Sequence, residues 1–225
     1  MERKSSLEAG SFDEEPKVRT WRARVREAGC TVESLEPLHL LHKRNGELLF
    51  ALLHARMRDP SGHSLLPYVL IRGDAALVVP RVRDRQTGEE RFVMVRQRRS
   101  GSGRAALEFP AGMLDRLVDD PVGVAAGELV EETGIRAVPD ELFPLTDRPL
   151  FTSPGLQDEA IHYFGYEAEL SHREFTALRG RRTGNGDEGE RIEVSLATRA
   201  EGEAGSVSTQ VRLGFYLFDA AARSR

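Results

Sequence analysis

The chain has 225 residues, 40% of them apolar and 30% charged, which is the composition of a globular protein that can bury a core. Its 32 basic and 36 acidic residues give a formal net charge of -4, which argues against nucleic acid or a membrane surface as the partner. The single cysteine, Cys30, excludes an intramolecular disulfide and a cysteine-built zinc site. We therefore expect the protein to be in a reducing compartment, the cytoplasm, with an organelle as the alternative.

Apolar periodicity and turn residues divide the chain into three predicted parts. Residues 1–16 are charged and polar and are expected to form a disordered tail, whereas 17–70 and 71–222 hold helices and strands. Pro121 and Gly134 mark the ends of a central helix. The predicted helices cover 17–30, 121–133 and 206–222, and the predicted strands cover 48–57, 68–72, 75–82, 91–97, 105–109, 142–150, 159–170 and 191–196. This order predicts an α/β fold, a mixed β-sheet sandwiched between α-helices, preceded by a β-rich extension.

The central helix carries three carboxylates. Glu128 precedes Glu131 and Glu132 by three and four positions, so the three side chains share about 100° of the helix circumference. A solvated acidic face is the simplest interpretation. Against it, no Lys or Arg within the helix pairs with these glutamates at helical spacing, and the last turns of a helix disfavour anions. The pattern therefore predicts a bound cation, and oxygen ligands favour Mg²⁺ or Mn²⁺.

The surrounding residues resemble the Nudix box, G-x5-E-x7-R-E-U-x-E-E-x-G-U. Residues 128–135, Glu-Leu-Val-Glu-Glu-Thr-Gly-Ile, fit the second half of the box at every fixed position. In that family a loop, a helix and a loop hold Mg²⁺. The resemblance implies that Glu128 and Glu132 are metal ligands together with the backbone carbonyl of Ala111. It also implies a catalytic role for Glu131, which supports the metal or the attacking water.

Two positions depart from the box. Gly112 lies one residue further from the helix than the consensus spacing, and Asp119 stands near the place of the first glutamate. Gly127 occupies the place of the arginine that orients and neutralises the glutamates in the family. A glycine inside a helix costs roughly 1 kcal/mol relative to alanine. A second hypothesis therefore stays open, in which the chain is a catalytically impaired Nudix-fold protein that binds nucleotide sugars or has a regulatory role.

Further motifs resemble the ADP-ribose and ADP-sugar diphosphatases, above all the plant ADP-glucose type, over roughly residues 45 to 220. Residues 108–112, Glu-Phe-Pro-Ala-Gly, resemble the entry to their box, and residues 152–159 resemble their S-P-G-x-x-x-E loop. The resemblance implies Mg²⁺-dependent hydrolysis of the diphosphate bond of ADP-glucose or ADP-ribose to AMP and a sugar phosphate. It also implies a homodimer in which residues 17–70 serve dimerisation.

Residues 179–189 are rich in glycine and charge, and they resemble the mobile acidic loop of the same enzymes. The resemblance implies that Glu188 is the general base and Glu190 a further metal ligand, with Asp187 as an alternative base. The simpler interpretation is a solvated, disordered surface loop.

Three residues are candidates for substrate binding. Arg72 and Arg99 offer bidentate donors for phosphate oxygens, although surface arginines at strand ends are the alternative. Glu108, at the entry to the box, is the third candidate. A third hypothesis for the whole chain is an acidic-helix interaction domain without metal, which predicts no Mg²⁺-dependent thermal shift.

Overall fold

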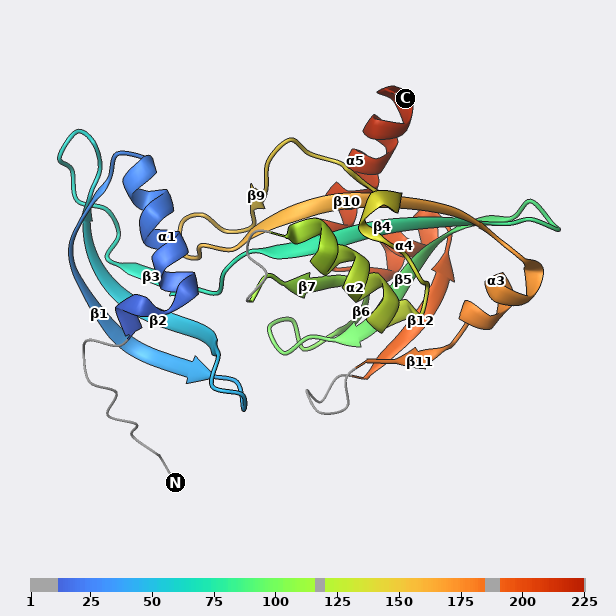
Figure 1. Cartoon of the computed structure of the whole chain (residues 1–225), viewed down its shortest axis with the longest axis horizontal. Coiled ribbons are helices and arrows are strands. Elements are labelled where there is room, and N and C mark those ends of the chain that lie inside the picture. Colours follow the sequence, from blue (N-terminus) through green and yellow to red (C-terminus); the bar gives the residue numbers. More distant parts are fainter. Residues whose placement is uncertain (1–11, 116–119, 185–190, 225) are drawn as a thin grey trace. The chain divides into compact units, whose positions relative to one another are not determined.

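The computed structural model describes residues 12–115, 120–184 and 191–224 (Figure 1). The chain forms two compact units. The N-terminal unit comprises the described residues through Asp74 together with Phe151–Ala160. The C-terminal unit comprises Ala75–Leu150 and the described residues from Ile161 onward.

The N-terminal unit is an antiparallel sheet packed against one helix. The strands follow one another in the order β1 (Thr31–His42), β2 (Leu48–Arg58) and β3 (Tyr68–Ile71), and α1 spans Pro16–Glu27. Val18 and Trp21 of α1 share an apolar cluster with Leu53 and Ile71 of the sheet. Strand β1 was not predicted, because its pairing with β2 shifts register at three places and few of its side chains are buried.

Residues 12–16 differ from the tail expected through Pro16. A short 3-10 helix, η1 (Phe12–Glu14), precedes α1, and Phe12 is buried in the same cluster as Trp21. One aromatic ring thus anchors a segment whose composition is otherwise charged and polar. Residues 1–11 of the predicted tail lie outside the described residues.

The C-terminal unit is built on a mixed sheet with the strand order β11-β12-β5-β4-β10-β8. Strands β6, β7 and β9 pair with β5, β4 and β10. Strand β4 runs parallel to β10, whereas β5 runs antiparallel to β4, β6 and β12, and β8, β7 and β11 run antiparallel to β10, β4 and β12. The strands are β4 (Ala75–Asp84), β5 (Glu90–Arg98), β6 (Ala105–Glu108), β7 (Ala111–Met113), β8 (Leu142–Pro144), β9 (Leu150–Phe151), β10 (Ala160–Leu170), β11 (Arg182–Thr183) and β12 (Ile192–Ala197).

Helices cover both faces of this sheet. Alternation along β4 turns Val78 toward the cluster that contains Leu129 of α2, and turns Val79 toward the cluster that contains Phe215 of α5. The helices are α2 (Pro121–Thr133), η2 (Pro139–Glu141), α3 (His172–Leu178), α4 (Arg199–Gly205) and α5 (Thr209–Ser224). The predicted mixed sheet between helices is therefore confirmed. No helix in the described parts of the chain is long and apolar enough to cross a membrane.

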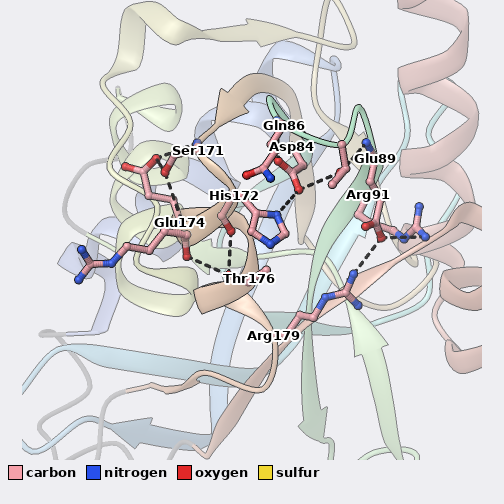
Figure 2. Close-up of polar contacts among 11 residues, drawn as sticks. Asp84, Gln86, Glu89, Arg91, Ser171, His172, Glu174, Thr176 and Arg179 are labelled. Carbon is pink, nitrogen blue, oxygen red and sulfur yellow. Dashed lines mark hydrogen bonds and ion pairs between the residues drawn. The ribbon is translucent and has the colours of Figure 1, made fainter.

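A polar network joins the end of β4 to the start of α3 (Figure 2). The buried carboxylate of Asp84 lies 2.7 Å from Nδ1 of His172 and accepts hydrogen bonds from the Gln86 N–H and the Thr87 hydroxyl. Burial raises the pKa of Asp84, but these hydrogen bonds, the His172 contact foremost, together lower it to about 2. At the other end of α3, the Arg179 guanidinium binds Glu89 at 2.8 Å.

Replacing Asp84 with asparagine is expected to lower the melting temperature at neutral pH by several degrees, because the charged acceptor of this network is lost. A pKa below the ordinary value of 3.8 stabilises the fold above that value, and the stabilisation is lost as the pH falls through about 2. The wild-type protein should therefore lose stability more steeply over this range than Asp84→Asn. Thermal melts followed by circular dichroism check this, with Asp140→Asn at an exposed position as control. Equal acid slopes in wild type and Asp84→Asn would refute it.

Candidate metal and catalytic site

Helix α2 begins and ends where its local sequence predicts. The Asp120 side chain caps the helix by accepting a hydrogen bond from the Gly123 N–H at 2.9 Å, and Pro121 occupies the first turn. Gly134 adopts a left-handed conformation with φ 77°, and its N–H bonds the Val130 carbonyl at 2.8 Å. These caps fix the rotation and the length of the helix that carries the glutamates.

Glu128 and Glu132 converge on one short segment of β7. Oε2 of Glu132, a residue only 4% exposed, accepts a hydrogen bond from the Ala111 N–H at 3.2 Å. Glu128 lies one helical turn earlier and packs directly over Gly112, where an added Cβ would stand 1.8 Å from its Oε1. A side chain at position 112 would therefore displace the Glu128 carboxylate.

The arrangement supplies oxygen donors of the kind a hard divalent cation prefers. Two carboxylates reach the same strand from a capped helix, and Glu131 lies exposed on that helix beside them. The ligand predicted at Ala111 was its carbonyl, whereas the contact in the structure is made by its N–H. The donor set therefore fits Mg²⁺ or Mn²⁺ in part. Within the described residues, no three His, Cys, Asp or Glu side chains are grouped closely enough to hold a metal ion.

The predicted general base Glu188, its alternative Asp187 and the predicted ligand Glu190 belong to the segment between β11 and β12. Asp187, Glu188 and Glu190 lie outside the described residues. The Thr183 hydroxyl, on the last residue of β11, donates to the Glu132 carbonyl at 2.5 Å, and Ile192 of β12 lies opposite Thr183.

A cation from elsewhere in the chain lies at the end of α2. A Cβ on Gly134 would stand 2.3 Å from Nη1 of Arg181, so this guanidinium packs against the C-terminal turn of the helix. Positive charge there stabilises the negative end of the helix dipole. The sequence pattern predicted that a metal ion alone supplies positive charge at this end of the helix, because Arg181 is remote from α2 in the sequence.

The predicted substrate-binding residues already have carboxylate or guanidinium partners. Nη2 of Arg99 lies 2.8 Å from Oε2 of Glu108, so two of the three candidates bind each other. Arg72 belongs to the N-terminal unit, where its Nη1 lies 3.1 Å from Oε1 of Glu159. A phosphate group at either arginine would have to replace or share that carboxylate.

Comparison with known proteins finds relatives that are named as hydrolases and pyrophosphatases. Nudix hydrolase 14, chloroplastic, of Arabidopsis thaliana is 31% identical over 170 residues, which are 72% of this chain and 54% of that protein. The ADP-ribose pyrophosphatase of Bacillus subtilis is 41% identical over 85 residues, 38% of this chain and 43% of that protein. The enzyme of the same name from Mycobacterium tuberculosis is 33% identical over 116 residues, 52% of each chain. Over the matched residues, the chain is similar to a Nudix hydrolase and to two ADP-ribose pyrophosphatases.

The Nudix fold is also found by comparison of structures. A crystal structure of an ADP compounds hydrolase matches with a TM-score of 0.58 and 18% sequence identity, covering 87% of this chain and 95% of the other. No protein-family model matches the chain. The chain spans about half the length of these curated relatives.

Proposed function

We propose that this chain hydrolyses the diphosphate bond of ADP-sugars, ADP-glucose and ADP-ribose among them, to AMP and a sugar phosphate with Mg²⁺ or Mn²⁺. The observation that carries the proposal is the convergence of Glu128 and Glu132 on Ala111 and Gly112. Relatives named ADP-ribose pyrophosphatase and a structural neighbour named ADP compounds hydrolase support a nucleotide diphosphate as the substrate.

In the proposed reaction, Glu128 and Glu132 hold the divalent ion from one rigid helix, with the Ala111 backbone beside them. When bound, the ion supplies charge neutralisation at the diphosphate and a lowered pKa for a bound water. Glu131, exposed on α2, would orient the attacking water. We further propose that Glu188 accepts the proton of the attacking water and that Glu190 completes the ligand set.

Substrate phosphates are proposed to bind Arg99. Its guanidinium can present two N–H groups to a phosphate while one stays on Glu108, since arginine has five donors in a planar fork. Glu108 then holds Arg99 in position at the edge of the diphosphate and contacts the substrate beside it. A role of Arg72 in substrate binding stays a prediction from the sequence.

The second candidate function is nucleotide-sugar binding or regulation without turnover, and Gly127 is the observation that favours it. Incubation with Mg²⁺ and ADP-glucose, ADP-ribose or UDP-glucose, with products separated by chromatography, distinguishes the two. We expect AMP and sugar phosphate from the ADP-sugars. Tight binding of these nucleotides without release of AMP or UMP from any of them would contradict the enzymatic proposal.

We infer a homodimer in which the N-terminal unit takes part. Leu38 and Leu41 of β1 and Tyr68 of β3 are large apolar side chains between 40% and 48% exposed, which a second copy could bury. Light scattering should give about twice the 25.1 kDa chain mass, and Leu38→Lys with Leu41→Lys should give the monomer mass. A wild-type mass of one chain would contradict the inference. A cytoplasmic location likewise stays a prediction, and one relative is named chloroplastic.

A further inference from the structure

Four arginines line a pocket in the C-terminal unit that the proposed reaction does not use. The pocket has a volume of about 620 Å³, within the range of small-molecule sites. It opens over β5, β12 and β11. Its charged lining residues are Arg96, Arg98, Arg182, Arg191 and Glu193.

The strand register places most of these arginines on one face of the sheet. Arg96 and Arg182 each lie directly opposite Glu193 on neighbouring strands. Along β5, alternation puts Arg96 and Arg98 on the same face as Met94, which belongs to the cluster covered by α5. The arginine face is therefore the one that α5 covers further along the strands.

The proposed catalytic residues occupy the other face. Val93 of β5 belongs to the cluster that contains Leu129 of α2, on the face opposite to Met94. Glu108 lies opposite Val95, which also alternates to that side. The side chains of Arg96, Arg98 and Arg182 are thus on the face opposite to α2, while Thr183, which also lines the pocket, bonds the Glu132 carbonyl.

The positive charge of the pocket is not neutralised within the described residues. In that part of the chain no carboxylate lies within 4.0 Å of any of the four guanidinium groups, and Arg98 alone makes a hydrogen bond, to the Gly103 carbonyl at 2.7 Å. All four arginines are exposed, and one glutamate faces them. One glutamate among four exposed arginines leaves an excess of positive charge, which favours a bound anion.

We propose that this pocket binds a chain of phosphate groups, separately from the carboxylate site of α2. Guanidinium groups bind phosphate oxygens through paired, charge-assisted hydrogen bonds. The arginines extend across β5, β12 and β11, which at roughly 4.8 Å per strand is about 10 Å, more than one phosphate covers. Inorganic polyphosphate and the triphosphate of a nucleotide share this chemistry.

Isothermal titration with tripolyphosphate and, separately, with ATP tests the proposal in the presence of a chelator. Without metal, the glutamates of α2 repel these ligands, so binding there does not contribute. We expect saturable binding by the wild-type protein. Arg96→Gln with Arg182→Gln should weaken it by at least about tenfold, because paired charge-assisted hydrogen bonds are lost. The ligand that binds with the higher affinity shows whether the pocket takes inorganic polyphosphate or the triphosphate of a nucleotide.

A matched control carries the same change of charge outside the pocket, Arg173→Gln with Arg212→Gln, at two exposed positions. It should bind as the wild type does. Arg96→Lys with Arg182→Lys keeps the charge without the planar fork and should bind with intermediate affinity. Absence of binding by the wild type, or equal weakening in the pocket and control variants, would overturn the proposal. Thermal melts of each variant establish that it is folded.

Discussion

Glutamine at position 132 is expected to slow Mg²⁺-dependent hydrolysis of ADP-ribose and ADP-glucose about a thousandfold, since a metal ligand loses its charge. The fold should tolerate the change. The amide oxygen can still accept the hydrogen bond that the Ala111 N–H donates at 3.2 Å. One charge fewer also relieves the repulsion between Glu132 and Glu128. Initial rates at saturating Mg²⁺, with a thermal melt of each protein, measure both effects.

The control for Glu132→Gln is Glu169→Gln, the same change on an exposed residue of β10 whose carboxylate is 4.0 Å from Arg85. It should hydrolyse both substrates at the wild-type rate, because an exposed ion pair of this length contributes little. A Glu132→Gln variant that retained most of the rate would remove Glu132 from the proposed ligand set. A variant that gained stability and bound no less Mg²⁺ would favour an acidic interaction helix instead.

Arginine at position 127 is expected to raise both the stability of the protein and its rate of hydrolysis. Gly127 is exposed, and an added Cβ would have no atom within 4 Å, so the side chain has room. Removing a glycine from the helix should add about 1 kcal/mol to the free energy of unfolding. The guanidinium also stands four residues before Glu131 and can neutralise the glutamates, for which we expect a rate increase of about tenfold.

Gly127→Ala separates the two effects. It should gain the helix stability of about 1 kcal/mol without the increase in rate. Chemical denaturation and initial rates of the three proteins, wild type, alanine and arginine, provide the comparison. If Gly127→Arg hydrolysed no faster than Gly127→Ala, the missing arginine would not be what limits the reaction.

Local chemistry explains what could be predicted from the sequence. The bounds of α2 follow from Pro121 and Gly134, whose backbone preferences act within a few residues. The mixed sheet follows from apolar runs separated by turn residues. The expectation that Glu128 and Glu132 face the Ala111 segment came from the resemblance to the whole Nudix box. Helical spacing alone does not determine which strand the helix packs against.

The remaining features depend on contacts between distant parts of the chain. Strand β1 was not predicted, because its register shifts break the alternation of side chains. Helices α3 and α4 have seven residues each, too few for a helical period to stand out. The predicted strand over 142–150 divides into β8 and β9. Arg181 at the end of α2, and the pairing of Arg99 with Glu108, arise only when the sheet sets their strands in register.

The central claim is that the carboxylates of α2 hold a divalent cation against β7. Titration of Mn²⁺ into the wild-type protein and into Glu128→Gln with Glu132→Gln, with free Mn²⁺ followed by electron paramagnetic resonance, tests it without reference to turnover. Saturable binding by the wild type and its loss in the double variant are the predicted result. Equal binding by both proteins, or none by the wild type, would contradict the claim.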